Sequence, residues 1–494
     1  MASLNIMDLM SDSGVGFGTS GARGLVVKMT DQVCYAYTRA FLQYLQTSAQ
    51  KITAVAIAGD LRSSTPRIMA AVSQAARDMG IEPINCGHAP SPTVALFGME
   101  QEIPAIMVTG SHIPDDRNGI KFNTALGEIT KTDEQGIREQ VIEYPENLFD
   151  GDGQFIQTVS LPAEDRRAIE HYKKRYTDFF ASNALDGQRV GLYQHSGVAR
   201  DLLNELLTSL GAEVIELSRS DTFIPVDTEA IRPEDEALAV AWAKQHDLHA
   251  IVSTDGDADR PLISDENGQW MRGDAVGALC GHFLGAEHVV TPVSSNTAID
   301  ISGWFDSVLR TRIGSPFVIE GMEQLTASGK EKVVGYEANG GFLIQDPIER
   351  NGKTLAPLPT RDAVIVIIGL LAHSKEQGIA MSKVVDQLPE RYTYSDRIKE
   401  IPQEKSASLL AGFDQGDVAI DRQRIEAFFD GVFGNVDEIN RTDGLRIRFD
   451  SGLIVHIRPS GNAPELRCYT EDDNYDEAVS SNQKALEFIR QAIT

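Results

Sequence analysis

The chain has 494 residues, of which 42% are hydrophobic and 24% charged, and Lys+Arg 45 against Asp+Glu 72 gives a net charge of −27. These proportions are ordinary for globular proteins, and the length suggests about three or four domains. The acidic balance argues against a nucleic acid or an anionic membrane as partner, because long-range repulsion opposes both. An anionic small molecule would need a local group of Arg and Lys side chains.

Membrane and export signals are not expected. No apolar run approaches the ~18 residues that span a bilayer. The first residues, MASLNIMDLMSDSG, contain two Asp and no basic residue, unlike the start of a secretory signal. The four cysteines are scattered and have neither the spacing of a metal site nor the number needed for a disulfide framework. They are Cys34, Cys86, Cys280 and Cys468. We therefore expect a cytoplasmic protein in a reducing compartment, and the sequence predicts no oligomeric state.

In chain order, apolar β-branched runs alternate with longer amphipathic stretches. AVAIAGD (54–60) predicts a buried strand that ends in a Gly-Asp turn, followed by a helix over 66–79 and a strand over 81–87. The same alternation returns twice, with strands that begin near residues 188, 212, 247, 288 and 332 and helical runs over 199–211 and 356–374. This is the pattern of strand–helix–strand units on a mostly parallel sheet.

The last hundred residues differ. Residues 444–471 alternate with period two around an Asp-Ser-Gly turn, which predicts antiparallel sheet, and a closing helix follows to the C-terminus. The sequence thus predicts three α/β segments and one α+β segment. We expect domains over residues 1–160, 161–265, 266–388 and 389–494, with boundaries uncertain by several residues.

An acidic loop follows the strand predicted before residue 255. Asp255, Asp257 and Asp259 alternate with small residues, so their side chains converge on one side of an extended segment. Three close carboxylates repel one another unless a cation lies between them, and Mg²⁺ suits a site of few oxygen ligands. The alternative is an Asp-rich turn on a solvated surface.

A calcium-binding loop is the other metal site that this segment could form. Glu266 stands at the twelfth position, where such a loop has its last ligand. The sixth position, however, has Arg260 in place of the required Gly, and Pro261 follows. Strands, and not helices, are predicted on both sides, so Mg²⁺ is the preferred ion.

Residues 107–122 contain a second candidate group. Ser111 follows an apolar strand and a Gly, His112 is adjacent, and Lys121 comes ten residues after Ser111. The Ser-x-x-Lys and Gly-x-Ser-x-Gly patterns of acyl-transfer enzymes are absent. Taken alone, Ser111 is as consistent with an ordinary turn residue as with a catalytic one.

Residues 457–469 offer guanidinium, hydroxyl, amide and backbone N–H groups in a short turn between strands, which suits a phosphate dianion. The alternative is a plain β-turn that begins at Pro459. The candidate ligands are Arg458, Ser460, Gly461, Asn462 and Arg467.

Two Gly-rich segments give weaker signals. In GYEANGGF (335–342), Glu337 and Asn339 could bind sugar hydroxyls, although an ordinary loop also fits. In GFGTSGARG (16–24), the dinucleotide-binding fingerprint is absent and Arg23 is the residue of interest, unless it is only a surface charge.

Taken in order, these loops resemble those of the α-D-phosphohexomutase superfamily, most like its phosphomannomutase/phosphoglucomutase branch. Residues 109–114 resemble the phosphoserine loop, and residues 255–260 match the metal loop in full. Residues 458–464 resemble the phosphate loop, and residues 337–340 correspond to the sugar loop. The resemblance covers essentially the whole chain. It implies three related α/β domains with mixed sheets, a C-terminal α+β domain, and an active site in the central cleft.

The resemblance also implies an activity, the interconversion of hexose 6-phosphate and hexose 1-phosphate through a phosphoserine and a bisphosphorylated sugar. Ser111 would carry the phosphoryl group, and Mg²⁺ would bind between that group and the three aspartates. The other implied roles are transfer assisted by Arg23, Lys121 and His112, sugar binding by Glu337, Asn339 and Arg260, and phosphate binding by Arg458, Ser460, Gly461, Asn462 and Arg467. Glucose or mannose 1,6-bisphosphate would be the activator.

Departures from the family pattern concern the substrate. Gly110 and Ile113 replace Ala and Asn beside the serine, and Asn462-Ala463 replaces Thr-Glu in the phosphate loop. Gly341 stands where a His is common in the sugar loop. Mannose phosphates are the first expectation. Glucose, glucosamine and N-acetylglucosamine phosphates are alternatives, and so is a non-catalytic sugar-phosphate-binding protein.

Overall fold

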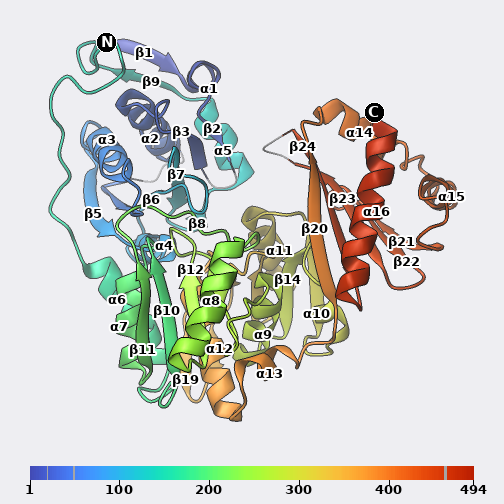
Figure 1. Cartoon of the computed structure of the whole chain (residues 1–494). Coiled ribbons are helices and arrows are strands. Elements are labelled where there is room, and N and C mark those ends of the chain that lie inside the picture. The colour runs from blue at the N-terminus through green and yellow to red at the C-terminus, as the bar shows by residue number, and fades with distance from the viewer. Residues whose placement is uncertain (19–20, 48–50, 461–463, 494) are drawn as a thin grey trace.

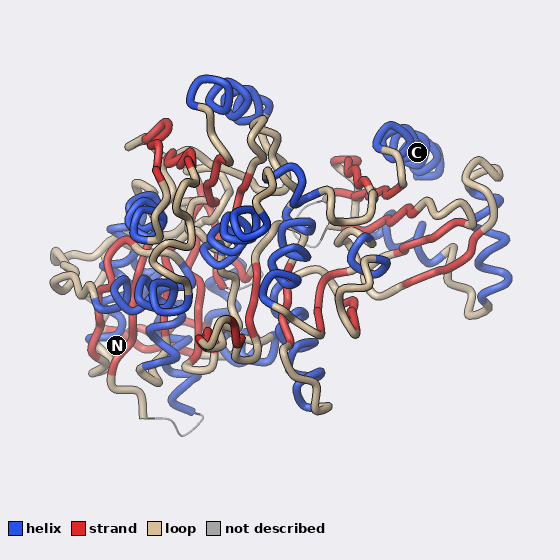
Figure 2. The backbone as a smooth tube through the Cα atoms, turned by 90° about the horizontal axis from the view of Figure 1, so that it is seen from below, coloured by secondary structure: helices blue, strands red, loops and turns tan. Residues whose placement is uncertain are grey.

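The computed structural model describes residues 1–18, 21–47, 51–460 and 464–493. The chain forms four regions in sequence order, three of α/β type and a last one of α+β type, as predicted (Figure 1). The C-terminal region stands to one side of the other three in both Figure 1 and Figure 2. In the part of the chain that the structure describes, no helix combines the length and apolarity needed to cross a bilayer.

The first region has a mixed sheet of seven strands in the order β2-β3-β7-β6-β4-β5, with β8 paired to the end of β7. Its strands are β2 (Gly16–Phe17), β3 (Gly21–Leu25), β4 (Ala54–Gly59), β5 (Glu82–His88), β6 (Ala105–Val108), β7 (Arg117–Thr124) and β8 (Gly127–Glu128). Its helices are α1 (Ile6–Ser13), α2 (Asp31–Thr47), α3 (Thr65–Arg77), α4 (Ser91–Glu100) and α5 (Lys131–Arg138). A separate ribbon pairs β1 (Ala2–Asn5) with β9 (Val141–Tyr144).

The second and third regions have four-stranded sheets in the orders β11-β10-β12-β13 and β15-β14-β16-β17. The second contains α6 (Arg167–Phe179), β10 (Arg189–His195), α7 (Arg200–Ser209), β11 (Glu213–Arg219), α8 (Pro233–His246), β12 (Ala250–Thr254) and β13 (Pro261–Ile263). The third contains α9 (Gly273–Leu284), β14 (His288–Pro292), α10 (Ala298–Ile301), β15 (Ser307–Thr311), α11 (Ser315–Ala327), β16 (Val333–Tyr336), β17 (Phe342–Ile344), β18 (Ile348–Arg350), β19 (Lys353–Leu355), α12 (Ala363–Gln377) and α13 (Met381–Val385).

One four-strand unit recurs in all three α/β regions. In each, the first strand pairs in parallel with the second and the third, and the fourth strand pairs antiparallel to the third. The turn between the third and fourth strands is therefore equivalent in the three sheets. That turn contains Ser111 in the first region, the three aspartates in the second, and Glu337 with Asn339 in the third. The topology thus repeats in the three α/β regions.

Helix α12 joins the second and third regions. It packs on α9 of the third and on β12 and β13 of the second, and the buried apolar residues of both regions form one cluster. Asp362 caps its first turn by accepting from Val364 N, and Tyr172 and Tyr176 of α6 donate to the same carboxylate. The sequence predicted a helical run from residue 356, but the helix begins at Ala363, because the prolines before it favour extended backbone and Asp362 supplies the cap.

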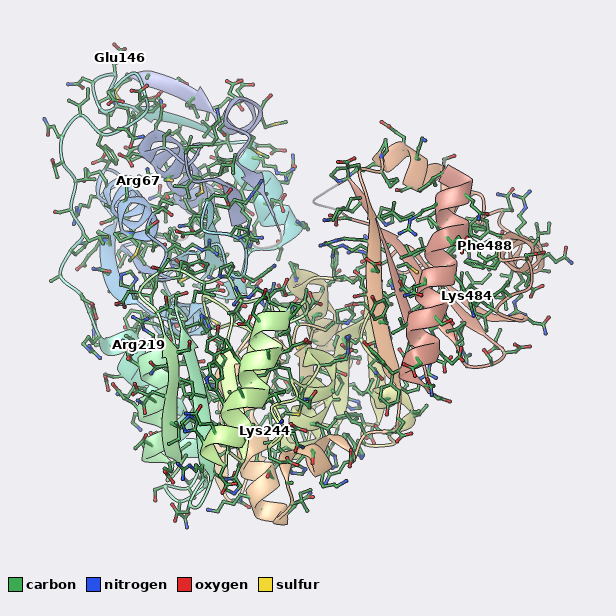
Figure 3. All side chains as sticks on the ribbon, viewed as in Figure 1. Arg67, Glu146, Arg219, Lys244, Lys484 and Phe488 are labelled. Atoms are coloured by element: carbon green, nitrogen blue, oxygen red, sulfur yellow. The ribbon has the colours of Figure 1, made fainter. Side chains whose placement is uncertain are left out.

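The C-terminal region is an antiparallel sheet in the order β20-β24-β23-β22-β21, with helices on one face. Its elements are β20 (Tyr392–Lys399), α14 (Gln403–Ala411), α15 (Val418–Phe428), β21 (Val436–Asn440), β22 (Leu445–Phe449), β23 (Ile454–Pro459), β24 (Glu465–Asp472) and α16 (Tyr475–Ile493). Phe488, labelled in Figure 3, reaches from α16 to the rings of Phe428 and Phe429. The predicted antiparallel strands and closing helix are confirmed. We keep boundaries near residues 160, 265 and 388 as a proposal, since each sheet lies within one predicted segment.

Candidate active site

Ser111 lies in the turn between β6 and β7 and is held against the metal loop of the second region. Its backbone has a φ of 54°, a left-handed conformation that few residues other than glycine adopt without support. Its hydroxyl donates to Asp255 Oδ2 at 2.6 Å, and His112 Nδ1 lies 3.2 Å from the same Oγ. The side chain is 1% exposed. The structure therefore brings the predicted serine and metal loops into direct contact.

Arg62, which was not among the predicted site residues, binds the backbone of this turn. Its guanidinium is fully buried and donates to the carbonyl oxygens of Ser111, Ile113, Pro114 and Arg117. Asp60 pairs with its Nε at 3.1 Å. The ring of Phe223, from the second region, lies 3.9 Å from the guanidinium carbon. Arg62 thus fixes the strained turn and also contacts the neighbouring region.

The three predicted metal-binding aspartates form a buried cluster. One oxygen from each lies within 4.8 Å of the others. Asp257 Oδ2 accepts from Ser91 and Lys121, and Asp259 Oδ2 accepts from Lys121 at 2.8 Å and from Arg361 at 3.0 Å. Oδ1 of both Asp257 and Asp259 is buried without a hydrogen-bond partner among the described residues. Asp259 Oδ1 has an ion-pair contact with Arg260 Nε at 3.6 Å. Two carboxylate oxygens without hydrogen bonds beside a third carboxylate suit a hard divalent cation such as Mg²⁺.

Electrostatics separate Asp255 from the other two aspartates. Burial, followed by the charges of Asp257 and Asp259, raises the pKa of Asp255 well above its ordinary value. Burial also opposes ionisation of Asp257 and Asp259, but both pKa values are lowered, that of Asp257 by Lys121 and a hydrogen bond from Ser91, and that of Asp259 by Arg361, Lys121 and Arg260. Neighbouring cations thus offset part of the charge of the cluster, and a divalent cation between the three carboxylates would reduce their mutual repulsion further.

The predicted cations converge on the same place. Arg260 Nη1 lies 2.9 Å from His112 Nδ1, and burial with Arg260 lowers the pKa of His112 to about 4, so its imidazole is neutral near pH 7. Since Arg260 can only donate, His112 Nδ1 accepts. The guanidinium of Arg23, on β3, makes no hydrogen bond or ion pair with the residues that the structure describes, and burial, followed by the charge of Arg260, lowers its pKa to about 10. A guanidinium beside this cluster can donate to an anion.

The sugar loop connects to the metal loop through Arg361, a second residue that the sequence analysis missed. Its guanidinium contacts Asp259 at 2.9 Å and Glu337 at 3.1 Å. Glu337 and Asn339 are both buried, and Thr228 of the second region donates to the carbonyl oxygen of Asn339 at 2.9 Å. The loop is thereby fixed to the second region on both sides.

The calcium interpretation is not supported by the position of Glu266. Its carboxylate accepts from the backbone N–H and the hydroxyl of Ser382, at 3.0 and 2.6 Å, beside the first turn of α13. Strands β12 and β13 flank the acidic loop on its two sides. Glu266 therefore accepts hydrogen bonds at the start of α13 and does not belong to the cluster of the three aspartates.

A cleft of about 360 Å³ lies between these loops and the C-terminal sheet. His112, Arg272 and Ala338 line one side, and Arg397, Arg467 and Tyr469 line the other. Of the predicted phosphate loop, Ser460 is buried and Arg458 Nε donates to Asp443 at 2.8 Å. Gly461 and Asn462 lie outside the described residues. The cleft thus has His112 of the serine loop and Ala338 of the sugar loop at one wall and arginines of the C-terminal sheet at the other.

Family models match the chain in four consecutive parts. Phosphoglucomutase/phosphomannomutase alpha/beta/alpha domains I, II and III match residues 14–147, 169–268 and 272–392, and the C-terminal domain matches residues 405–486.

Full-length relatives are found among known proteins. The chain is 42% identical to a phosphomannomutase of Salmonella muenchen over 98% of each chain. It is 40% identical to a phosphomannomutase of Sinorhizobium fredii over 94% of this chain and 96% of the relative. The fold is that of a phosphoglucomutase/phosphomannomutase family protein of Burkholderia thailandensis, with a TM-score of 0.72, 19% identity, and 96% of both chains covered.

Proposed function

Because the chain belongs to the phosphoglucomutase/phosphomannomutase family, we propose that it is an isomerase that interconverts hexose 6-phosphate and hexose 1-phosphate, with mannose phosphates as substrates. The observation that carries the proposal is the contact between Ser111 Oγ and Asp255 Oδ2, next to two buried carboxylate oxygens that make no hydrogen bond to the described residues. The full-length phosphomannomutase relatives support mannose. Glucose, glucosamine and N-acetylglucosamine phosphates are the alternatives.

The reaction starts from Ser111 in its phosphorylated form. The bond between phosphorus and Ser111 Oγ breaks as a bond forms to the free hydroxyl oxygen of the hexose phosphate. This gives a hexose bisphosphate and a free serine. The proton of the attacking hydroxyl ends on Ser111 Oγ as the phosphoryl group leaves, and Lys121, Arg23 and His112 assist this transfer. After the bisphosphate reorients, the same steps run in reverse with its other phosphoryl group.

Cationic side chains stabilise the negative charge on the phosphoryl group as it is transferred. Lys121 and Arg23 face it from the first region, and Arg260 faces it from the second. Mg²⁺ held by Asp255, Asp257 and Asp259 and by an oxygen of the phosphorylated Ser111 would neutralise part of that charge as a Lewis acid.

The rest of the cleft holds the substrate in either orientation. We assign the phosphate that does not react to Arg458, Ser460, Gly461, Asn462 and Arg467, and the sugar hydroxyls to Glu337, Asn339 and Arg260. A glucose or mannose 1,6-bisphosphate would act as activator, because it can phosphorylate a free Ser111 and leave as the monophosphate.

A coupled assay tests the proposal. The protein is supplied with Mg²⁺, a trace of hexose 1,6-bisphosphate, and in turn mannose, glucose and N-acetylglucosamine 1-phosphate. We expect turnover of mannose 1-phosphate to be fastest, and intact-mass spectrometry to show one added phosphoryl group that Ser111→Ala removes. Faster turnover of another sugar would change the substrate and keep the mechanism. No turnover of any of the three, with no phosphorylated species, would indicate a sugar-phosphate-binding protein.

A further inference from the structure

The C-terminal sheet has two unlike faces. Alternate residues of a strand point to opposite faces, so residues 398, 466 and 457 share one face, while residues 397, 467 and 458 share the other. The first face is apolar and is covered by the helices of that region. The second carries arginines on four of the five strands, at Arg397, Arg446, Arg448, Arg458 and Arg467. Part of this face lines the cleft of the active site.

Three of these arginines stand in one row across neighbouring strands. Arg397 of β20 lies directly opposite Arg467 of β24, and Arg467 lies directly opposite Arg458 of β23. Adjacent strands are about 4.8 Å apart, so the three side chains rise next to one another from a strip about 10 Å wide. Like charges directly opposite each other destabilise a sheet. Such a row is costly unless an anion binds to it.

The chain's own carboxylates do not fully neutralise the row. Arg458 has a hydrogen-bonded partner in Asp443, at 2.8 Å. Glu465 forms longer ion pairs with the other two arginines, at 3.5 Å from Arg397 and 3.9 Å from Arg467. Arg467 Nε is buried and makes no hydrogen bond to any described residue. Glu229, which also lines the cleft, acts on Arg467 as a further negative charge. Arg397 and Arg467, the two arginines of the row that line the cleft, thus have only the longer ion pairs with Glu465.

We propose that Arg397 is a substrate-binding residue that contacts the non-reacting phosphate of the hexose phosphate together with Arg467. Both side chains line the cleft, opposite His112 and Ala338. A phosphate dianion has oxygens enough for two guanidinium forks, and charge-assisted contacts of this kind are among the strongest hydrogen bonds in proteins. Arg397 comes from β20, far in sequence from the predicted phosphate loop, and no motif assigns it. This inference rests on the proposed function.

The competing explanation is that Arg397 only forms a half-exposed ion pair with Glu465. Its side chain is 49% exposed, and ion pairs of that kind contribute little. The two explanations differ in what Glu465→Gln does. If the ion pair matters, Glu465→Gln reproduces the defect of Arg397→Gln. If phosphate binding matters, Glu465→Gln leaves the affinity for substrate unchanged or improves it, because the carboxylate no longer competes.

Steady-state kinetics on the full chain separate these explanations. We expect Arg397→Gln to raise KM for mannose 1-phosphate by about 10- to 100-fold, the loss of one or two charged hydrogen bonds, with kcat changed much less. Arg397→Lys should recover part of the affinity. Arg448→Gln, on the same face but paired with Asp437 and Glu438, is the matched control and should behave as wild type. A wild-type KM in Arg397→Gln, or an equal increase in Glu465→Gln, overturns the proposal.

A direct measurement of ligand binding tests the role of Arg397 without relying on turnover. Titration calorimetry with mannose 1-phosphate is carried out on Ser111→Ala, with and without Arg397→Gln. If the Ser111→Ala protein binds the ligand and Arg397→Gln weakens that binding by the expected factor, Arg397 is a phosphate ligand even if the wild type turns over no hexose phosphate. If the two proteins bind equally, Arg397 has no such role, whatever the activity of the wild type.

Discussion

The hydroxyl of Ser111 and the carboxylate of Asp255 meet at 2.6 Å, although they belong to turns of two different sheets. The two turns occupy the same position in their four-strand units, between the third and the fourth strand, and the polar side chains of each face the other. The contact holds Ser111 Oγ against the aspartate cluster, and groups fixed in this way can stabilise developing charge without reorganising during a reaction.

Removal of the metal should abolish turnover without unfolding the chain. We expect activity to fall on treatment with a chelator and to return with added Mg²⁺. Asp257→Asn should lower kcat by about 100-fold or more, because a lost Lewis-acid contact is worth several kcal/mol. Activity against Mg²⁺ concentration measures both effects. Glu266→Gln is the control, and a changed metal dependence in that variant would restore the calcium interpretation.

Arg62→Leu should destabilise the first region strongly. Arg62 donates to four carbonyl oxygens and pairs with Asp60, whose carboxylate would remain buried without its counter-ion. Removal of one partner of a buried pair costs about 3–5 kcal/mol of unfolding free energy. Urea unfolding measures the change. Arg67→Leu, which breaks the partly exposed pair with Asp31, should cost no more than about 1 kcal/mol, and equal losses for the two variants would contradict this account.

His456 should make the C-terminal region sensitive to acid. Burial, together with Arg446, holds the pKa of His456 at about 4, against an ordinary value of 6.5. Below about pH 6.5 the unfolded chain binds a proton at this residue that the folded chain does not bind until about pH 4. Stability is therefore lost as the pH falls through that window, by up to ~3 kcal/mol, and the loss ends below it.

A comparison of the wild type with His456→Gln shows how much of the loss of stability in acid is due to His456. Thermal unfolding of the wild type and of His456→Gln is measured between pH 7.5 and 4.5, since glutamine can keep a donor for the carbonyl oxygen of Asp443. The variant should show a smaller fall in melting temperature across this range. Parallel curves for the two proteins would show that His456 does not set the acid limit.

The contact between Tyr172 and Asp362 should couple the second and third regions. Tyr172 donates to the buried carboxylate at 2.7 Å, and burial raises its pKa, so it remains a donor. Tyr172→Phe should cost about 1.5–3 kcal/mol and speed amide hydrogen exchange in both α6 and α12. Tyr193→Phe, which loses a hydrogen bond to Asp235 within the second region, should leave exchange in α12 unchanged. Faster exchange in α6 alone would contradict the coupling.

Much of the site could be predicted because its groups lie in short turns. Asp255, Asp257 and Asp259 have a local spacing, and Ser111 follows an apolar strand and a glycine, so both loops are visible in the sequence. The period-two alternation of residues 444–471 likewise predicts the antiparallel strands β22, β23 and β24. In each case the signal lies within one short continuous segment of the chain.

Arg62 and Arg361 could not be found in this way. Arg62 binds carbonyl oxygens about fifty residues away in sequence, and Arg361 joins two loops that it does not adjoin. Carbonyl acceptors leave no mark in a sequence, because every residue has one. Arg397 was missed for a related reason, since its row depends on the register of β20 against β24. The strand order of the sheet had to be known first.

Helix α12 also has a consequence for the order in which the chain folds during synthesis. The sheet of the second region ends with β13 at Ile263, but the helix that covers it ends only at Gln377. At the ordinary rate of about 5–20 residues per second, the ribosome takes on the order of ten seconds to make the chain between them. Throughout that interval the nascent second region has an apolar sheet surface without its cover. A chaperone that binds such surfaces has its longest opportunity there, and slower translation of residues 264–377 should increase the yield of aggregated chains.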